Sequence, residues 1–193
     1  MAAGEGRRLR PLTERWPKPV LPLAGRPVIA SLLRELSAAG LGPVTIVTGH
    51  LAEQVEELVG DGRAFGLELS FVRQPRPDGS ADAVRRALAA GARPPLVVSG
   101  ADKLYRPGDV GAFAAAFEAS GADAALALEP DGSTVPLWGL TEAVSPRLAD
   151  LSGPPYELLD AVEGLEVAKI EIGKARDLTD PLDLMRGNFP YLQ

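Results

Sequence analysis

The sequence predicts an α/β fold, a Rossmann-like three-layer α/β/α sandwich with a mostly parallel central sheet. Short apolar runs of about five residues alternate along the chain with longer stretches of helical periodicity, which favours parallel strands joined by helices. The chain has 193 residues, of which 46% are hydrophobic and 24% charged, so it can bury one sizeable core. No internal repeat or low-complexity linker divides it. We therefore expect a single domain over residues 1–193.

The predicted helices share apolar residues spaced three and four positions apart. In residues 28–40 these side chains fall on one face, and Gly40 provides a stop. Towards the end of the chain, Asp180 is suited to an N-cap and Pro181 to the first helical position. The predicted helices cover residues 28–40, 53–59, 81–90, 108–120, 155–162 and 180–187.

The predicted strands are short apolar runs bounded by turn residues. They cover residues 44–48, 67–72, 95–99, 124–128, 138–143 and 165–172. In open α/β sheets the carboxyl ends of the strands form the usual ligand edge, so polar residues that follow a strand are candidate site residues.

The overall charge and composition exclude several classes of function. The net charge is −6 and the sequence pI is about 4.9, which argues against broad nucleic-acid binding. No apolar run approaches the roughly 20 residues that span a bilayer, and no signal peptide is visible, so we expect no membrane association and a cytoplasmic location. The absence of cysteine excludes disulfides, and with one histidine it argues against a zinc site.

The amino end concentrates features that suit a polyphosphate. In residues 2–6, Gly4 and Gly6 can expose backbone N–H groups to phosphate oxygens. Arginines follow at positions 7, 8 and 10, and Lys18 stands between two prolines that restrict its backbone. From these residues alone, a phosphate-binding loop and an ordinary solvated loop remain equal alternatives.

The whole amino end resembles the signature of the sugar-1-phosphate nucleotidylyltransferases, approximately LAAGxGTRLxPLTxxxPKPLLPVxGKP. The resemblance implies transfer of NMP from an NTP to a sugar-1-phosphate, with release of pyrophosphate. It also implies nucleotide binding by the turn and catalytic roles for Arg8 and Lys18. The matching residues are Ala2, Ala3, Gly4, Gly6, Arg8, Leu9, Pro11, Leu12, Thr13, Pro17, Lys18, Pro19, Leu21, Pro22, Gly25 and Pro27.

Two aspartates are predicted to hold Mg²⁺. Asp102 follows the strand at 95–99 in a segment similar to the family's GDxxY, whose Asp binds the catalytic metal. Asp177 lies in a segment that resembles WxDxGTPxDL, in which the Asp is the second metal ligand. Asp180 is a competing carboxylate, and a turn or helix cap is the alternative role for Asp102.

Two further patches are assigned through the same resemblance. Gln74 and Gly79, in a segment similar to the family's Gln and LGTA loop, are expected to bind the nucleotide at its base. Glu157 lies in a segment that resembles YELTDA and is expected to bind the acceptor sugar. An ordinary polar loop and a surface helix are the respective alternatives. Residues 1–130 thus form the expected nucleotide-binding part and residues 131–193 a shortened acceptor-side part.

The chain departs from the family pattern at two places. Family members carry a hydrophobic strand directly before the AAGxG turn, whereas Met1 stands there here. We therefore expect a truncated first strand and a true start upstream, and a natural variant that fills the gap differently is the alternative. Glu129 and Pro130 match an EKP motif without its lysine, which contacts the sugar phosphate in the family. Two alternatives therefore stay open: a catalytically weakened, nucleotide-binding regulatory homologue and an enzyme with a non-sugar phosphate acceptor. The base, the sugar and the oligomeric state, a homo-oligomer included, are also open.

Overall fold

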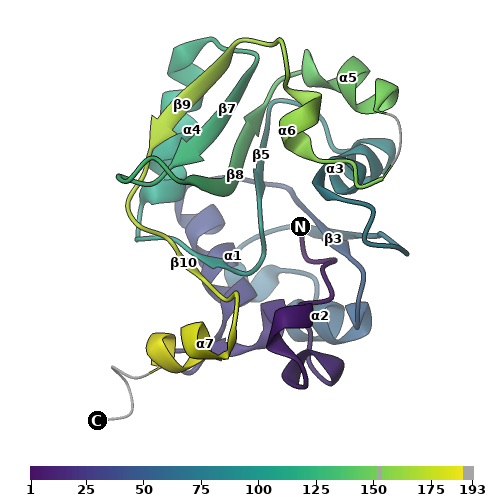
Figure 1. Cartoon of the computed structure of the whole chain (residues 1–193), viewed down its shortest axis with the longest axis vertical. Coiled ribbons are helices and arrows are strands. Elements are labelled where there is room, and N and C mark those ends of the chain that lie inside the picture. The colour runs from purple at the N-terminus through teal and green to yellow at the C-terminus, as the bar shows by residue number, and fades with distance from the viewer. Residues whose placement is uncertain (152–153, 189–193) are drawn as a thin grey trace.

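The computed structural model of the chain describes residues 1–151 and 154–188, in which helices cover both faces of a layer of strands (Figure 1). β3 pairs in parallel with β4. A four-stranded sheet has the order β5-β8-β7-β9, in which only β8 runs against its neighbours. The predicted α/β class with mostly parallel strands is therefore confirmed. These strands are β3 (Val44–Thr48), β4 (Leu69–Arg73), β5 (Leu96–Ser99), β7 (Ala124–Leu128), β8 (Thr134–Leu140) and β9 (Val167–Glu171).

The alternation of side chains along β7 separates the two helical layers. Ala125 and Ala127 point into a core shared with α1 and α4, where Phe113 is fully buried. Ala124 and Leu126 point into a second core shared with α3, α5 and α6. The longer helices are α1 (Val28–Ala38), α2 (Ala52–Val59), α3 (Ser80–Ala89), α4 (Asp109–Ser120), α5 (Val144–Asp150), α6 (Leu158–Ala161) and α7 (Pro181–Asn188).

The carboxyl half differs most from the sequence prediction. β8 begins four residues before the predicted strand at 138–143 and ends at Leu140, and the unpredicted helix α5 follows it closely. The helix predicted at 155–162 contracts to the four residues of α6. The prediction missed two-residue strands because they are too short to show a periodicity. These are β1 (Pro22–Leu23), β2 (Arg26–Pro27), β6 (Lys103–Leu104) and β10 (Arg176–Asp177).

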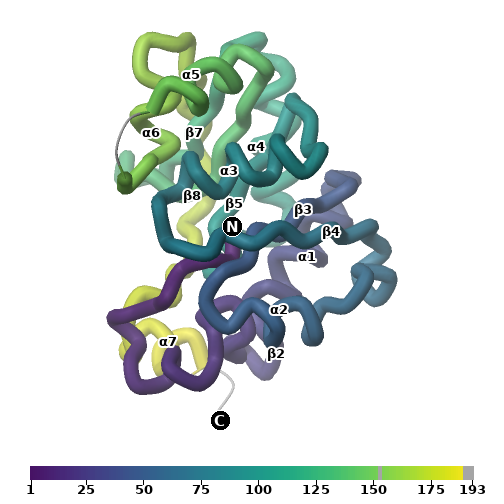
Figure 2. Tube along the Cα trace, turned by 90° about the vertical axis from the view of Figure 1, so that its right-hand side faces the viewer, coloured from purple at the N-terminus to yellow at the C-terminus, as the bar shows by residue number. Residues whose placement is uncertain are grey.

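The amino terminus lies in the middle of the molecule, beside β3 (Figures 1 and 2). Ala2 forms a parallel bridge with Thr48 of β3. On its other side, the Met1 amino group donates a hydrogen bond of 2.7 Å to the carbonyl oxygen of Ser99 in β5. Burial lowers the pKa of this amino group to about 6, although the nearby charge of Asp102 opposes the shift. Residues 1 and 2 therefore join the two sheets at their carboxyl ends.

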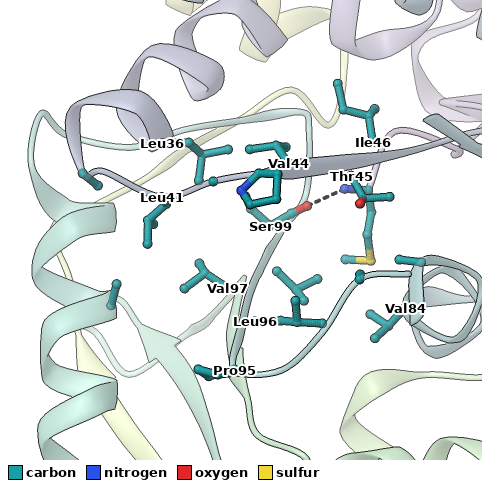
Figure 3. A pocket seen from close by; sticks show the side chains of 18 of the residues that line it. Leu36, Leu41, Val44, Thr45, Ile46, Val84, Pro95, Leu96, Val97 and Ser99 are labelled. Carbon is teal, nitrogen blue, oxygen red and sulfur yellow. Dashed lines mark hydrogen bonds between the residues drawn. The ribbon is translucent and has the colours of Figure 1, made fainter. Parts of the chain in front are cut away.

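An apolar groove of about 1070 Å³ separates β3 from β5 beyond Met1. Val44, Leu96 and Val97 line it, as does Leu36 of α1 (Figure 3). The edges of β3 and β5 that face the groove pair with no other strand in the described part of the chain. The groove is thus an apolar gap between two strand edges that are unpaired in the described part of the chain, and the truncation of the first strand stays a prediction.

Three-residue 3-10 helices shape the segment that follows the amino terminus. They are η1 (Arg7–Leu9), η2 (Leu12–Glu14) and η3 (Lys18–Val20), and a fourth, η4 (Arg63–Phe65), precedes β4. Across the described residues, no helix combines the length and the apolar character needed to cross a membrane.

Candidate functional site

A cavity of about 390 Å³ brings most of the predicted site residues together. It opens beside the amino terminus, at the carboxyl ends of β3 and β5, which is the ligand edge of an open α/β sheet. Segments as far apart in the sequence as Met1 and Thr179 contribute to its wall. The predicted residues that line it are Ala2, Ala3, Gly4, Gly6, Arg8, Lys18, Gln74, Gly79 and Asp102.

The turn at residues 2–6 is stabilised by a hydrogen bond from Thr13. The Thr13 hydroxyl, which is 1% exposed, donates a hydrogen bond of 2.9 Å to the Gly6 carbonyl oxygen. Gly6 has φ 63°, and a Cβ there would lie 2.8 Å from the Thr13 methyl carbon. Gly4 does not adopt a positive φ, and a Cβ at Gly4 would meet nothing within 4 Å. The conformational freedom of glycine is therefore required at Gly6, while Gly4 leaves its side of the turn open to a ligand.

Alternating charges connect the two predicted metal ligands. The Lys18 ammonium contacts Asp102 Oδ2 and lies 3.9 Å from Asp177 Oδ1. Lys103, whose side chain is 13% exposed, places its ammonium 2.6 Å from Asp177 Oδ2. β6 and β10 set this geometry because their antiparallel pairing puts Asp177 opposite Lys103. The two carboxylates thus face one site, with a lysine against each.

Asp177 retains an oxygen that is suited to a cation. Burial by itself would raise the pKa of Asp177, but hydrogen bonds from Lys103 and Thr179, with the charge of Lys18, hold it below its usual value. Oδ1 of Asp177 is buried and accepts no hydrogen bond from the described residues. No group of three or more acidic or histidine side chains that could hold a metal ion by themselves occurs in that part of the chain. Mg²⁺ commonly takes one or two carboxylates together with phosphate oxygens and water, so this pair fits such an ion.

Gln74 is fixed in one orientation by two acceptors. Its amide nitrogen donates to the carbonyl oxygen of Gly79 at 3.0 Å and to Asp82 Oδ2 at 2.8 Å. Asp82, which is 1% exposed, also accepts hydrogen bonds of 2.6 Å from Arg85 and from Arg86. Burial would raise the pKa of Asp82, but the bonds from Arg86, Gln74 and Arg85 outweigh burial and lower it. Sequence reasoning identified Gln74 and missed Asp82, whose role depends on a tertiary contact.

The loop around Gly79 is packed tightly against the segment at Tyr156. Gly79 has φ 105° and ψ 174°, and a Cβ there would lie 2.2 Å from the Tyr156 carbonyl oxygen. Glu157 does not line the cavity, but its carboxylate accepts a hydrogen bond of 2.5 Å from the hydroxyl of Ser80, which does. The predicted acceptor-binding residue therefore lies behind the wall formed by Ser80.

Asp180 serves as a cap. Its Oδ1 accepts hydrogen bonds from the backbone N–H groups of Leu182 and Asp183 at the start of α7. In the reciprocal direction, the Asp183 carboxylate accepts hydrogen bonds from the backbone N–H groups of Thr179 and Asp180, as in a capping box. These bonds confirm the predicted N-cap. The salt-bridge partners of Lys18 are Asp102 and Asp177 instead.

The chain is similar in sequence and in fold to nucleotide-transferring proteins. It is 40% identical over 104 residues to the N-acetylmuramate alpha-1-phosphate uridylyltransferase of Neisseria meningitidis, a match that covers 52% of this chain and 44% of the relative. It is 37% identical over 137 residues to the CMP-5'-(3-aminopropyl)phosphonate synthase of Streptomyces rubellomurinus, covering 70% of this chain and 22% of that protein. The chain thus spans less than half the length of these curated relatives.

A solved structure shows the same fold over nearly the whole chain. This is a Bacillus anthracis protein assigned as a glucose-1-phosphate thymidylyltransferase, with a TM-score of 0.87 at 19% identity. The superposition covers 98% of this chain and 92% of the other. The family model described as nucleotidyl transferase matches residues 1–149. With that match over most of its length, the chain belongs to the nucleotidyl transferase family.

Proposed function

We propose that the protein transfers NMP from an NTP to a sugar-1-phosphate and releases pyrophosphate. The observation that carries this proposal is the single cavity that gathers an open backbone turn, Arg8, Lys18 and Asp102, beside Asp177. The similarity to the N-acetylmuramate alpha-1-phosphate uridylyltransferase of Neisseria meningitidis supports the acceptor class. The named relatives are enzymes, which favours transfer over a purely regulatory role.

The reaction is an in-line displacement at the α-phosphorus of the NTP. A phosphate oxygen of the acceptor forms the new bond to that phosphorus, and the bond to the bridging oxygen of the β-phosphate breaks. Pyrophosphate leaves with the electron pair. Because the acceptor phosphate is already ionised at neutral pH, the chain needs no strong general base. Catalysis then rests on positioning and on stabilising negative charge.

The predicted residues on the phosphate side of the cavity each have a role in that chemistry. The N–H groups of the turn at Gly4–Gly6 and the guanidinium of Arg8 hold the β- and γ-phosphates, which become the leaving pyrophosphate. The Lys18 ammonium neutralises charge at the α-phosphate. Asp102 and Asp177 would hold Mg²⁺, which supplies electrostatic stabilisation of the phosphate oxygens when bound. Residues 1–130 supply the nucleotide side of the site, and Asp177 joins it from the acceptor-side part.

The ion pairs at this site must rearrange when substrate binds. Lys18 contacts Asp102, and Lys103 contacts Asp177, so each carboxylate is already neutralised by a lysine. A triphosphate in the cavity offers the Lys18 ammonium a new partner, and the oxygens of Asp102 are then available to the cation. Lys18 thereby moves from a carboxylate to a phosphate within the cavity, whereas Lys103 is not among the residues that line it.

The test is pyrophosphate release measured with each NTP against a panel of sugar-1-phosphates, with and without Mg²⁺. Asp102→Asn should lower kcat by about 100-fold or more while leaving the thermal unfolding midpoint nearly unchanged, because it removes one charge and little volume. Asp131→Asn is the matched control, because Asp131 is exposed, does not line the cavity and has its side-chain hydrogen bonds with Ser133. Mg²⁺–NTP binding without turnover across the whole panel would instead support the regulatory alternative. Full activity of Asp102→Asn would refute the metal assignment.

A further inference from the structure

We propose that Asp82 is a positioning residue that turns Gln74 into a hydrogen-bond acceptor for the nucleotide base, so that the site selects bases with a ring N–H. This rests on the proposed function and concerns the NTP half of its site. The bases with such a group are uracil and thymine, at N3, and guanine at N1. Cytosine and adenine instead present a lone pair at the equivalent ring nitrogen.

The orientation of Gln74 follows from the chemistry of its two neighbours. The carbonyl oxygen of Gly79 and the ionised carboxylate of Asp82 can only accept hydrogen bonds. Only the NH₂ group of the Gln74 amide can satisfy both, so the carbonyl oxygen Oε1 must face the other way. A flipped amide would place Oε1 against two acceptors.

The remaining oxygen is directed at the cavity. Gln74 is 5% exposed and lines the cavity that also holds the turn at Gly4–Gly6 and Lys18. Oε1 of Gln74 accepts no hydrogen bond from any described residue. Among those residues, Oδ1 of Asp177 is the only side-chain polar atom that is both buried and without a partner, so Oε1 of Gln74 is accessible. A nearly buried amide with both donors engaged therefore presents one acceptor, and a base must supply the donor.

Asp82 is itself held rigidly enough to impose this orientation. Its two oxygens are anchored by Arg85 and Arg86, which lie about one turn further along the same helix face, at i+3 and i+4. Arg85 is fixed further by lying 5.0 Å over the ring of Tyr156. The backbone N–H of Gln74 donates a hydrogen bond of 2.7 Å to the Thr48 carbonyl oxygen, which fixes the backbone of Gln74 as well. The Gln74 side chain is therefore preorganised, so little conformational entropy is lost when a base binds.

The test compares two substitutions of one residue. Asp82→Asn keeps an oxygen that can accept from Gln74 but removes the charge, whereas Asp82→Leu has a similar branched shape and offers no acceptor. The wild-type protein should favour UTP over CTP by about 10- to 100-fold in kcat/KM, the range expected when one base leaves a buried acceptor unpaired. Asp82→Asn should stay within about threefold of that ratio, and Asp82→Leu should lower it about tenfold.

Two measurements separate positioning from general damage. Inorganic tripolyphosphate, followed by calorimetry, should bind wild type and both variants with the same affinity, because it uses only the phosphate side of the cavity. Gln74→Leu, which removes the acceptor directly, should abolish the UTP preference even if Asp82→Leu fails to fold. Asp78→Asn removes a carboxylate from the same loop without touching Gln74 and should leave the ratio unchanged.

The outcomes distinguish this inference from the proposed function. An unchanged UTP/CTP ratio in a folded Asp82→Leu or in Gln74→Leu would overturn the role of Asp82 while NMP transfer stands. An Asp82→Asn variant as unselective as Asp82→Leu would show that charge, and not the acceptor, sets the preference. Wild-type protein that binds tripolyphosphate but neither binds nor turns over any NTP would refute the proposed function itself.

Discussion

The loop at Gly79 gives the sharpest test of how the backbone positions the base-binding side of the site. In Gly79→Ala, the new Cβ would lie 2.2 Å from the carbonyl oxygen of Tyr156, whereas real Cβ contacts are essentially never shorter than 3.0 Å. One of the two segments must therefore move. Tyr156 is held there by two backbone hydrogen bonds, from its N–H to the Asp78 carbonyl oxygen at 2.7 Å and from Ala81 N–H to its own carbonyl oxygen at 2.8 Å.

The expected loss in the free energy of unfolding of Gly79→Ala has two parts. The backbone of Gly79, at φ 105° and ψ 174°, lies in a region that is essentially restricted to glycine, and a side chain there costs about 1–3 kcal/mol. Weakening the two hydrogen bonds adds about 1 kcal/mol each. The expected loss is about 3–5 kcal/mol, or roughly 6–20 °C in the thermal unfolding midpoint of a chain this size. The KM for UTP should rise as well, because Gln74 donates to the Gly79 carbonyl oxygen.

Gly91 supplies a matched control. Its φ of 112° is nearly that of Gly79, but a Cβ there would meet nothing within 4 Å. Gly91→Ala should therefore show the backbone cost alone, about 1–3 kcal/mol, with an unchanged KM. The assays are calorimetric or circular-dichroism melts and initial-rate kinetics on both variants. If Gly79→Ala loses no more stability than Gly91→Ala, the close approach to Tyr156 does not constrain the loop and this reasoning is wrong.

Three further predictions test the amino end. In protein that begins at Met1, the amino group has a folded-state pKa of about 6 against an ordinary value of 8.0, so the unfolded chain binds more protons between these values and the free energy of unfolding should rise by up to about 3 kcal/mol from pH 6 to 8. The same protein with an acetylated amino group should lack this contribution when it is unfolded by urea. Joining five apolar, strand-forming residues ahead of Met1 should fill the groove between β3 and β5 and raise the melting temperature by several degrees. A serine-rich extension of the same length should not raise it. Equal melting temperatures of the two extended proteins would contradict the expectation that the groove accepts an apolar strand. Thr13→Val should cost about 0.5–1.5 kcal/mol, because the Gly6 carbonyl oxygen loses the Thr13 hydroxyl and keeps the Leu9 N–H, and an unaltered urea midpoint would count against that contact.

The regular part of the fold could be predicted from the sequence because it depends on local periodicity. β3 and β7 have the predicted bounds, and α1 and α4 agree to within two residues. The carboxyl half could not be predicted as well, because β6 and β10 have only two residues each and exist by pairing with one another. No local pattern of hydrophobicity reports a contact between residues that are more than seventy positions apart.

The candidate site divides in the same way. The turn at Gly4–Gly6 and Lys18 are recognisable in sequence because they belong to a long ordered signature, and Asp102 because it follows a strand in a segment similar to GDxxY. Lys103 and Asp82 carry no such signal. Lys103 matters through its contact with Asp177, and Asp82 through its contact with Gln74.

The sequence by itself determined the class of the fold, the family signature and the residue types available for binding phosphate, since these are properties of order and spacing along the chain. Only the tertiary structure decided which of those residues share one cavity, that a lysine faces each aspartate, and that Gln74 has a single orientation. The physical reason is that hydrogen bonds and ion pairs depend on distances of about 3 Å in space. Separation along the chain does not fix such distances until the sheet and its helices have packed.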